Sequence, residues 1–294
     1  MMFIKRNLIF LTIFLIILNL MTNFQICKFA YGEKLYVGGS GEGNYSIIQN
    51  AINISSEGDI IFIYNGTYYE NIDINKSISL IGEDKEKTII KGKNSLNVIT
   101  LKAQWINITG FTVQEGKISG ICIESSRNCN IYQNIINYNS IGINIISSNN
   151  IIVFNNTISN NSILGLNITN MQTPFNFSNY NTIFHNNFIY NKKNVYDEGV
   201  SNNWSYQNQG NFYDDYSGSD KNNDGIGDSS YIVPGGESKD NFPLMMPYIG
   251  KIRLKDFYVD YESIYKMLII GMIIAILFLL PIAYIWYKKT KHLK

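Results

Sequence analysis

Short stretches of alternating apolar and polar residues recur along the middle of the chain, separated by Asn, Gly and Ser. The segment 106–113 is the first clear copy, and further copies begin near residues 129, 151 and 182. The positions that we align in the four copies are Ile108, Ile131, Val153 and Phe184. Their separations are 23, 22 and 31 residues, so the last step is one normal repeat plus nine residues, which we place in a loop over the polar segment 171–179.

A second strand repeats in the same rhythm, at residues 120–123, 142–145 and 165–168. Each repeat therefore holds at least two short strands. Helical repeats are the alternative, but the abundance of β-branched residues and the scarcity of Ala, Leu and Glu oppose them. The pattern predicts an all-β fold, a right-handed parallel β-helix of the pectate-lyase-like kind, with coils of ~22–23 residues.

Asparagine stands at an equivalent position of three copies, Asn134, Asn156 and Asn187, where the first copy has Phe111. Asparagine adopts the left-handed backbone conformation more readily than most residues, which suits a sharp corner. In coils stacked ~4.8 Å apart, its amide can also bond the equivalent amides above and below. We therefore expect these asparagines to form a ladder along one corner.

Both ends of such a coil need covering, because an open end offers unpaired backbone groups to other chains. Apolar residues at 47, 48, 51 and 52 form a helical stripe after Asn44 and Ser46, which predicts an N-terminal cap. Strands are then expected at 60–64, 68–72, 78–81, 88–91 and 98–101. Roughly the last 30 residues before Gly250 would cap the other end.

Two long apolar runs lie outside the repeats. Residues 8–20 follow Lys5 and Arg6 and precede the small residues around Gly32, which is typical of a secretory signal peptide, with an uncleaved anchor as the alternative. Residues 267–286 carry no charge and are long enough to cross a ~30 Å hydrocarbon core. The lysines from Lys288 onward favour a cytoplasmic tail.

The predicted organisation is a signal peptide (1–32), a β-helix ectodomain with caps (33–249), a stalk (250–265), one transmembrane helix (266–287) and a basic tail (288–294). We expect a single-pass protein of the cell membrane with an extracellular or periplasmic ectodomain. Residues 33–264 hold 16 basic and 23 acidic residues, a net charge of −7. That charge argues against nucleic acid as a partner.

The cysteines give little information about function. Cys27 lies in the predicted signal peptide. Cys122 alternates out of phase with the apolar residues beside it, whereas Cys129 is in phase with Ile131. We expect the two to point to opposite faces of the wall, which argues against a disulfide between them.

Segments at both ends of the repeat region resemble NosD-type β-helix proteins, the nitrous-oxide-reductase accessory proteins and their archaeal surface-protein relatives. The opening segments are 48–52 (IQNAI), 58–63 (GDIIFI), 65–71 (NGTYYEN) and 76–82 (KSISLIG). The closing segments are 210–216 (GNFYDDY), 224–228 (DGIGD) and 240–244 (DNFPL). The resemblance covers about residues 44–246 and implies the β-helix fold, but the fold itself hosts lyases, hydrolases, adhesins and inert surface proteins.

The accessory proteins of that family are associated with copper-site maturation, which the resemblance would imply here. Copper prefers imidazole, thiolate and thioether ligands. The ectodomain offers His185, expected on the outer wall beside an inward Phe184, and the methionines Met171, Met245 and Met246. These residues form no recognisable ligand pattern, so the sequence argues against copper as a cofactor.

The sharpest local motif is the segment 220–228, DKNNDGIGD. Its oxygen-bearing residues at alternate positions around a glycine turn match the first half of an EF-hand-like calcium loop. The pattern then breaks, because position twelve is Tyr231, where a bidentate carboxylate is needed. We predict a structural calcium ion held by Asp220, Asn222, Asp224 and Asp228, with a plain acidic turn as the alternative.

A polysaccharide hydrolase of this fold would need two carboxylates facing one another at ~5–10 Å. On the coil walls, Glu124 is followed in the next two coils by Ile146 and Thr169, so no acid pair repeats there. Acids that could still form a site cluster near the C-terminal end: Asp197, Glu198, Asp214 and Asp215.

Outward Tyr, Asn and Ser on a flat wall suit sugar binding, and the chain has 21 tyrosines. Ten N-x-S/T sequons occur, of which Asn160 and Asn176 on outer turns are the glycosylation candidates. The leading hypothesis is a non-catalytic, membrane-anchored surface protein for envelope structure or for binding carbohydrate and envelope components. The alternatives are a β-helix lyase or glycosidase acting on extracellular polysaccharide, and a copper-site accessory protein.

Overall fold

The computed structural model describes residues 32–93, 96–171 and 177–250. The predicted transmembrane helix and basic tail lie outside the described residues, as do all but the last residue of the predicted signal peptide and all but the first residue of the predicted stalk. Among the residues that are described, no helix is long and apolar enough to cross a membrane. Residues 32–249 belong to one compact unit.

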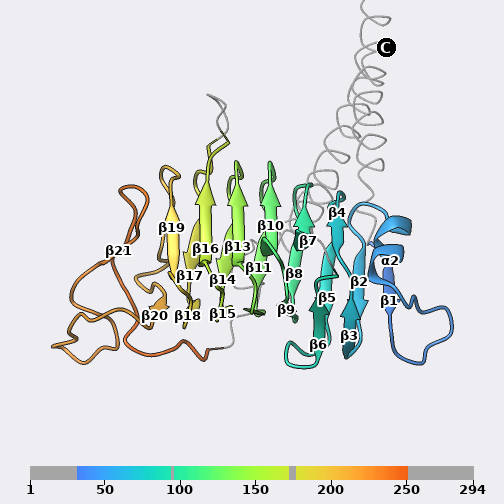
Figure 1. Ribbon diagram of the computed structural model, residues 1–294, viewed down its shortest axis with the longest axis horizontal. Helices are drawn as coiled ribbons and strands as arrows, with labels where there is room; N and C mark the ends of the chain where they lie inside the picture. Colours follow the sequence, from blue (N-terminus) through green and yellow to red (C-terminus); the bar gives the residue numbers. More distant parts are fainter. Residues whose placement is uncertain (1–31, 94–95, 172–176, 251–294) are drawn as a thin grey trace, which may run out of the picture. The chain divides into compact units, whose positions relative to one another are not determined.

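Three parallel sheets form the walls of a β-helix, and each full coil contributes one strand to each sheet (Figure 1). Sheet A contains β1 (Lys34–Val37), β2 (Ile60–Ile63), β5 (Ser79–Gly82), β8 (Asn107–Thr109), β11 (Asn130–Tyr132), β14 (Ile152–Phe154) and β17 (Thr182–Phe184). Sheet B contains β3 (Gly66–Tyr69), β6 (Thr88–Lys91), β9 (Thr112–Gln114), β12 (Ile135–Asn137), β15 (Thr157–Ser159), β18 (Asn187–Ile189) and β20 (Phe212–Tyr213). Sheet C contains β4 (Ile72–Ile74), β7 (Asn97–Leu101), β10 (Ser119–Glu124), β13 (Ile141–Ile146), β16 (Leu164–Thr169) and β19 (Val195–Asp197).

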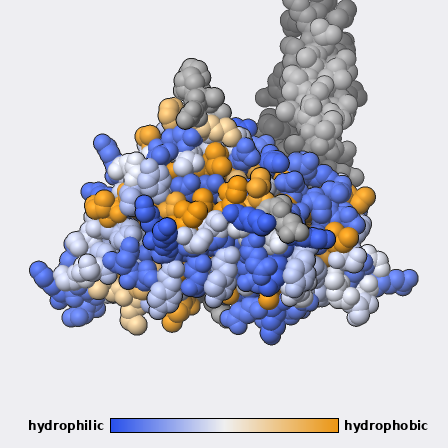
Figure 2. Space-filling view, viewed as in Figure 1, coloured by the Kyte–Doolittle hydropathy of each residue, from blue (hydrophilic) through white to orange (hydrophobic). Residues whose placement is uncertain are grey.

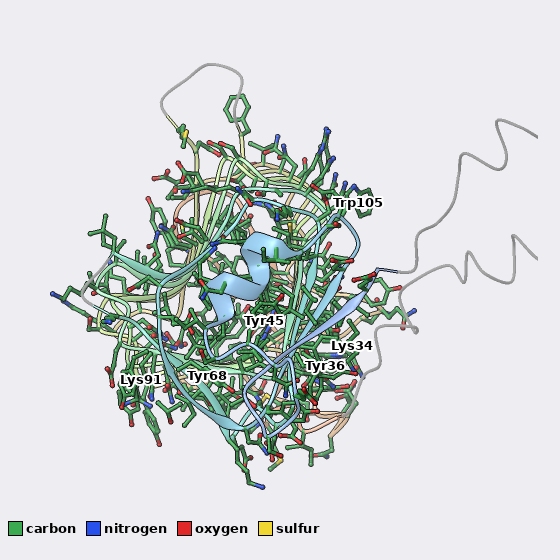
Figure 3. All side chains as sticks on the ribbon, turned by 90° about the vertical axis from the view of Figure 1, so that its right-hand side faces the viewer. Lys34, Tyr36, Tyr45, Tyr68, Lys91 and Trp105 are labelled. Atoms are coloured by element: carbon green, nitrogen blue, oxygen red, sulfur yellow. The ribbon has the colours of Figure 1, made fainter. Side chains whose placement is uncertain are left out.

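The hand of the coil follows from the view along its axis. Figure 3 looks from the N-terminal end, and the labelled residues appear in the order Lys34, Tyr68, Lys91 and Trp105. This order runs clockwise as the chain recedes from the viewer, so the coil is right-handed. The predicted right-handed parallel β-helix is therefore confirmed, with three strands per coil where the repeats had indicated at least two.

Columns of aliphatic side chains fill the interior. The inward residues of sheet A in three successive coils, Ile108, Ile131 and Val153, pair directly and are fully buried. Sheet C contributes a parallel column that includes Ile121 and Ile143. Each such side chain stabilises the fold by roughly 1.5–3 kcal/mol through removal from water, which is why the apolar period, more than any local propensity, fixes the coil.

The alignment of the last copy is wrong by one residue. Val153 pairs with Ile183, and Phe154 pairs with Phe184, so the step is 30 residues and the insertion holds eight. Phe184 instead extends a buried aromatic stack on the outer side of sheet A, with ring centroids 5.0 Å apart for Tyr132 and Phe154 and 5.4 Å apart for Phe154 and Phe184. Because side chains alternate along a strand, an error of one residue exchanges the two faces.

The same correction applies to the asparagine ladder, which consists of Asn134, Asn156, Asn186 and Asn211 and does not include Asn187. Each side-chain Nδ2 donates to the Oδ1 of the next coil, at 3.1, 3.0 and 3.0 Å in turn. All four side chains are fully buried at the corner between sheets A and B, the A–B corner. The predicted ladder exists, and it is a satisfied interior network.

The left-handed residue at this corner precedes Phe111 and three of the four ladder asparagines, Asn134, Asn156 and Asn186, and the ladder residue itself is not left-handed. Gly110, Gln133, Asn155 and His185 have φ angles of 83°, 54°, 56° and 54°. Side chains at these positions lie outside the ladder, so their identity varies from coil to coil.

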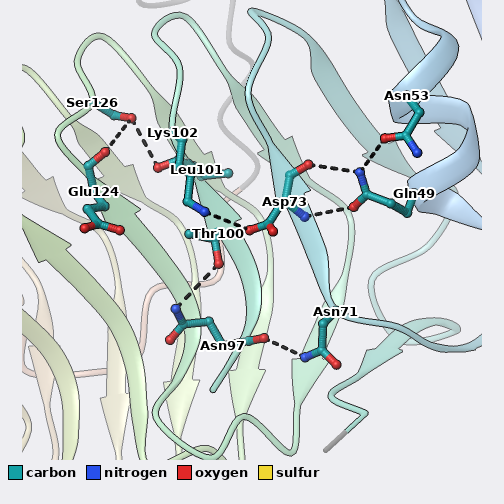
Figure 4. Close-up of polar contacts among 10 residues, drawn as sticks. All are labelled: Gln49, Asn53, Asn71, Asp73, Asn97, Thr100, Leu101, Lys102, Glu124 and Ser126. Atoms are coloured by element: carbon teal, nitrogen blue, oxygen red, sulfur yellow. Dashed lines mark hydrogen bonds and ion pairs between the residues drawn. The ribbon is translucent and has the colours of Figure 1, made fainter. Parts of the chain in front are cut away.

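The predicted N-terminal cap is the helix α2 (Ile48–Ile54), which lies across the opening of the first coil (Figure 3). The Glu70 carboxylate accepts hydrogen bonds from the first helical amides, those of Ile48 and Gln49, at 2.9 and 3.0 Å. The Gln49 side chain bonds the backbone of Asp73 in β4 through both its oxygen and its nitrogen (Figure 4). Lys102, which follows β7, pairs with the Asp73 carboxylate at 3.5 Å and so joins two neighbouring strands of sheet C below the cap.

The predicted C-terminal cap consists of irregular turns and a hairpin of β21 (Tyr231–Ile232) and β22 (Lys239–Asp240). The asparagine ladder ends in this cap, where the Asn211 amide donates to the buried carboxylate of Asp240 at 2.7 Å. Tyr213 of the last coil stacks on Tyr231 with ring centroids 3.7 Å apart.

Candidate functional site

A cleft of ≈ 770 Å³ lies at the corner where the strands of sheet B lead into sheet C, the B–C corner. It spans the last coils and reaches the C-terminal cap. Its lining is mainly polar and includes two tyrosines, one lysine and two aspartates: Tyr138, Asn160, Asn161, Ser162, Tyr190, Asn191, Lys192, Asn194, Asp214 and Asp215.

Two exposed tyrosines stand on the rim of the cleft in a regular column. Tyr138, Asn160 and Tyr190 each follow the sheet B strand of successive coils and have left-handed φ angles of 55°, 53° and 54°. The left-handed turn directs the side chain away from the wall, so Tyr138 is 62% and Tyr190 76% exposed. The two tyrosines are therefore two coils apart, about 10 Å along the axis at the usual strand spacing.

A second asparagine ladder supports this column from behind. Asn139, Asn161 and Asn191 immediately follow the left-handed residues, and the amides of Asn139 and Asn161 donate to the Oδ1 of the next coil at 3.0 and 3.1 Å. Their Nδ2 atoms donate to the same oxygens at 3.2 and 2.9 Å. This network holds the backbone under the two exposed rings in one conformation, so little conformational freedom remains to be lost on binding.

Two carboxylates close the C-terminal end of the cleft. Asp214 accepts hydrogen bonds from the Tyr190 amide at 2.6 Å and from Asn194 Nδ2 at 2.9 Å. Asp215 accepts from Asn194 Nδ2 at 2.8 Å and from the Tyr231 hydroxyl at 3.3 Å. Burial, and then the nearby Asp215 charge, raises the pKa of Tyr231, so this hydroxyl stays protonated as a donor.

No ion pair within the described part of the chain involves either of these carboxylates. Each oxygen therefore keeps acceptor capacity toward the cleft, because a carboxylate oxygen can accept more than one hydrogen bond. Exposed aliphatic residues precede three strands of sheet C: Leu96, Ile118 and Ile163. Figure 2 shows hydrophobic side chains in a broken band across the face on which these strands begin.

The four residues of the predicted calcium loop lie together in one exposed turn of the C-terminal cap. Asp220 accepts hydrogen bonds from the amides of residues 224 and 225 at 3.2 and 2.9 Å, and Asn222 Nδ2 donates to Asp224 at 2.9 Å. Asp228 closes the turn by accepting from the Lys221 amide at 3.0 Å. Calcium binding here stays a prediction; in the described chain, no three His, Cys, Asp or Glu side chains gather closely enough to be recognised as a metal site.

Of the two glycosylation candidates, Asn160 is exposed at the centre of the cleft, and Asn176 lies outside the described residues. Of the four C-terminal acids, Asp214 and Asp215 line the cleft, whereas Asp197 is fully buried. Its carboxylate accepts hydrogen bonds from Trp204 Nε1 at 2.9 Å and from Ser238 Oγ at 2.7 Å, which is a structural role.

The sequence predicts His185 on the outer wall, but its side chain is buried, with 6% exposed. Its ring stacks on Tyr248 with centroids 3.9 Å apart, and its Nε2 contacts Gln209 Oε1 at 2.6 Å. Burial lowers the pKa of this imidazole, and the Gln209 contact acts in the opposite direction. The residue serves packing between the last coils and the C-terminal cap.

The two cysteines of the described chain are free and buried. Cys122 pairs with Asn144 in the outer rows of sheet C, and Cys129 is fully buried in the core. They face opposite sides of the wall, as expected, and burial raises the pKa of both thiols to about 11.

Sequence reasoning missed Tyr138 and Tyr190, although the repeat contains the signal. Both occupy the first position after the sheet B strand, one residue before an asparagine that recurs in three coils and is buried in the first two of them. Alignment of this second asparagine position would have placed the two tyrosines in one outward column.

No family model matches the chain. Among curated proteins, it is 39% identical over 71 residues to "Probable pectinesterase/pectinesterase inhibitor 12" of Arabidopsis thaliana, covering 22% of this chain and 13% of that protein. It is 38% identical over 95 residues to a "Cell surface glycoprotein" of Methanothermus fervidus, covering 31% of this chain and 16% of that protein. The matched parts thus span less than a fifth of these relatives' own length.

Among solved structures, the chain is similar to a pectin methylesterase from carrot, with 14% identity, 62% of this chain and 71% of that chain covered, and a TM-score of 0.40. It is also similar to ORF18 of Geobacillus virus E2, with 19% identity, 56% and 44% covered, and a TM-score of 0.45. The NosD-type resemblance stays a prediction. The sequence similarities are confined to a stretch shared with a cell surface glycoprotein and a stretch shared with a pectinesterase.

Proposed function

We propose that the chain is a membrane-anchored surface protein that binds carbohydrate without altering it chemically, and that the cleft at the B–C corner is the binding site. The observation that carries the proposal is the pair of tyrosines, Tyr138 and Tyr190, held 62% and 76% exposed in one column over a rigid ladder. Large exposed aromatic rings on a preorganised backbone suit stacking against the apolar faces of sugar rings.

The polar groups of the cleft favour a neutral glycan over a polyanionic one. Asp214 and Asp215 present acceptors for sugar hydroxyls, and no cation of the described chain neutralises them. Residues 33–264 carry a net charge of −7, which further repels a polyuronate. Lys192 is the basic group in the cleft lining.

Placement at the cell surface rests on the terminal sequence segments. The run 8–20 has the features of a signal peptide, and the uncharged run 267–286 has those of a membrane span. The Methanothermus fervidus relative is named a cell surface glycoprotein, which supports the same placement.

The test is affinity electrophoresis of the full chain, made in cells without N-glycosylation and purified in detergent, through gels containing galactomannan, mixed-linkage β-glucan or polygalacturonate. We expect retardation by a neutral polysaccharide. The double change Tyr138→Ala and Tyr190→Ala should lower its affinity about tenfold or more, because two aromatic contacts of ~0.5–1.5 kcal/mol each are lost. Tyr180→Ala is the matched control, since Tyr180 is 64% exposed and also left-handed but stands at a different corner.

Equal loss of binding in the control and in the double variant would contradict the proposal. Retardation by polygalacturonate alone would contradict the preference for neutral sugar. Release of reducing ends or of methanol from methylated pectin, abolished by Asp214→Asn, would assign catalysis to the cleft in place of simple binding.

A further inference from the structure

Asn160 begins the sequon Asn160-Asn161-Ser162 and stands in the middle of the cleft. Its side-chain amide makes no hydrogen bond to any residue within 32–93, 96–171 or 177–250, whereas Asn161 behind it is buried in the second ladder. The amide nitrogen of Asn160 is therefore accessible from solvent and is not needed by the fold.

Two other sequon asparagines of the coil walls differ from Asn160. Asn107 Nδ2 donates to Ser79 Oγ, and Asn167 Nδ2 donates to Asn144 Oδ1, both at 2.9 Å. A sugar on either nitrogen would displace a contact between adjacent coils. Asn160, like Asn75 after β4, combines an exposed side chain with an amide that makes no hydrogen bond within the described residues. Of these two positions, Asn160 is the one in the cleft.

The neighbours of Asn160 along the column are the two exposed tyrosines, one coil before it and one coil after it. A glycan leaving the Asn160 side chain must rise between these rings, ~5 Å from each backbone at the strand spacing. The first sugars then meet aromatic faces on both sides, and the Asp214 carboxylate lies one coil beyond Tyr190.

We propose that Asn160 is an N-glycosylation site whose attached glycan covers Tyr138 and Tyr190 and closes the cleft to external polysaccharide. The closing of the cleft rests on the proposed function; the modification itself needs only export of the chain. In the transfer step, a bond forms between Asn160 Nδ2 and C1 of a lipid-linked oligosaccharide. The C1–O bond to the lipid phosphate breaks, the phosphate leaves with the electron pair, and one amide proton passes to a base of the transferase.

The experiment uses the full chain made in cells that N-glycosylate exported proteins. Glycopeptide mass spectrometry reports occupancy of Asn160, and hydroxyl-radical footprinting reports the accessibility of individual tyrosines. We expect glycan on Asn160 and severalfold slower oxidation of Tyr138 and Tyr190 than in the Ser162→Ala variant, which lacks the sequon but keeps Asn160. Tyr69, 61% exposed at the N-terminal end of sheet B, is the internal control and should be oxidised equally in both proteins.

The matched sequon control is Asn75→Gln, because residue 75 is exposed and follows β4, three strands from β13 in sheet C. That variant should leave the protection of both tyrosines unchanged. In galactomannan gels, Ser162→Ala should bind about tenfold tighter than the glycosylated chain.

An unmodified Asn160 in a chain that carries glycan at residue 75 would overturn the inference. Equal oxidation of the two tyrosines with and without the Asn160 glycan would also overturn it. If neither protein binds galactomannan or β-glucan while Asn160 is modified and both tyrosines are protected, the proposed function fails and the glycan site stands.

Discussion

The A–B corner and the B–C corner have the same backbone construction, but they differ in the exposure of the side chains at the left-handed position. Each has a left-handed residue followed by a buried asparagine that bonds its equivalent in the next coil. At the A–B corner the left-handed residues include Gln133 and His185, neither of which is exposed. At the B–C corner they include Tyr138 and Tyr190, which project into solvent beside a cleft.

The difference shows how a repeat protein separates stability from function. The ladder asparagine fixes the backbone and tolerates little change, because its amide satisfies buried backbone groups. The left-handed turn fixes the direction of the side chain of the residue before it, but that side chain makes no contact with the ladder. Function can therefore change at that position without cost to the coil.

The largest expected effect comes from deletion of a ladder side chain. Asn156→Ala removes bonds to the carbonyls of Ile131 and Phe154 and leaves the Asn134 amide without its acceptor. With several buried groups unsatisfied at ~1–3 kcal/mol each, we expect a loss of about 4 kcal/mol or more in the free energy of unfolding, measured by urea denaturation. Asn161→Ala at the B–C corner should cost a comparable amount, since its side chain is 1% exposed and bonds Ile136 and Asn191.

A small effect of Asn161→Ala beside a large effect of Asn156→Ala would show that the two ladders are not equivalent. Tyr190→Ala in the same series should change the unfolding free energy by less than about 0.5 kcal/mol, as expected for an exposed side chain. A large loss from the ladder variants beside a small loss from Tyr190→Ala would show that the stability of the coil depends on the ladder asparagine and not on the left-handed residue before it.

The second effect concerns the carboxylate that ends the A–B ladder. Burial raises the pKa of Asp240 to about 6, from 3.8, against the hydrogen bonds from Asn211 and Phe242 that lower it. The folded protein thus holds this proton more tightly than the unfolded chain. The stability contributed by protonated Asp240 is fully present below pH 3.8 and is lost as the pH rises through about 6, by about 3 kcal/mol in all.

Asp240→Asn should remove that slope, so the measurement is unfolding free energy against pH between 4 and 7. The slope is more informative than the absolute stability, because Asn cannot accept from both amides that Asp240 serves. An unchanged slope in the variant would assign the pH dependence to another group. Asp215→Asn at the end of the B–C corner is the matched control.

The sequence carried the coil period and the fold, because the apolar column repeats in every coil. It did not carry the register across the insertion before β17. The length of that insertion cannot be read from the sequence, and an error of one residue assigned Phe184 to the inward position that Ile183 occupies. It also did not reveal the cleft, because Tyr138 and Tyr190 are far apart in sequence and come to line one column only through the stacking of coils. Burial of His185 depends on Tyr248 in the C-terminal cap, which no repeat predicts.

The third prediction concerns the acidic turn of the C-terminal cap, residues 220–228, whose side chains are largely exposed, unlike those of the buried ladders. Its side-chain oxygens already point to backbone amides of the same turn. If calcium replaces these contacts as predicted, millimolar calcium should raise the unfolding temperature by about 2–4 °C through preferential binding to the folded state. The double change Asp220→Asn and Asp228→Asn should abolish the shift, whereas Asp84→Asn in an exposed turn near β6 should not. Equal shifts in all three proteins would identify a general ionic effect.

The smallest effect tests the left-handed position itself. Burial lowers the pKa of His185, so the folded protein keeps this ring neutral when the unfolded chain takes up a proton. Stability contributed by the neutral ring is present above pH 6.5 and falls as the pH drops below that value, the opposite sign to Asp240. His185→Asn should remove this loss while keeping the φ angle of 54°, because Asn tolerates the left-handed region.

Gln133→Asn, at the equivalent position two coils earlier, is the control and should leave the pH dependence unchanged. If both variants lose stability equally at every pH, His185 acts only as a corner residue. If only His185→Asn flattens the loss of stability at acidic pH, the left-handed position of the A–B corner has a role beyond the turn. Its side chain then packs against the C-terminal cap, whereas Tyr190 at the B–C corner projects into solvent.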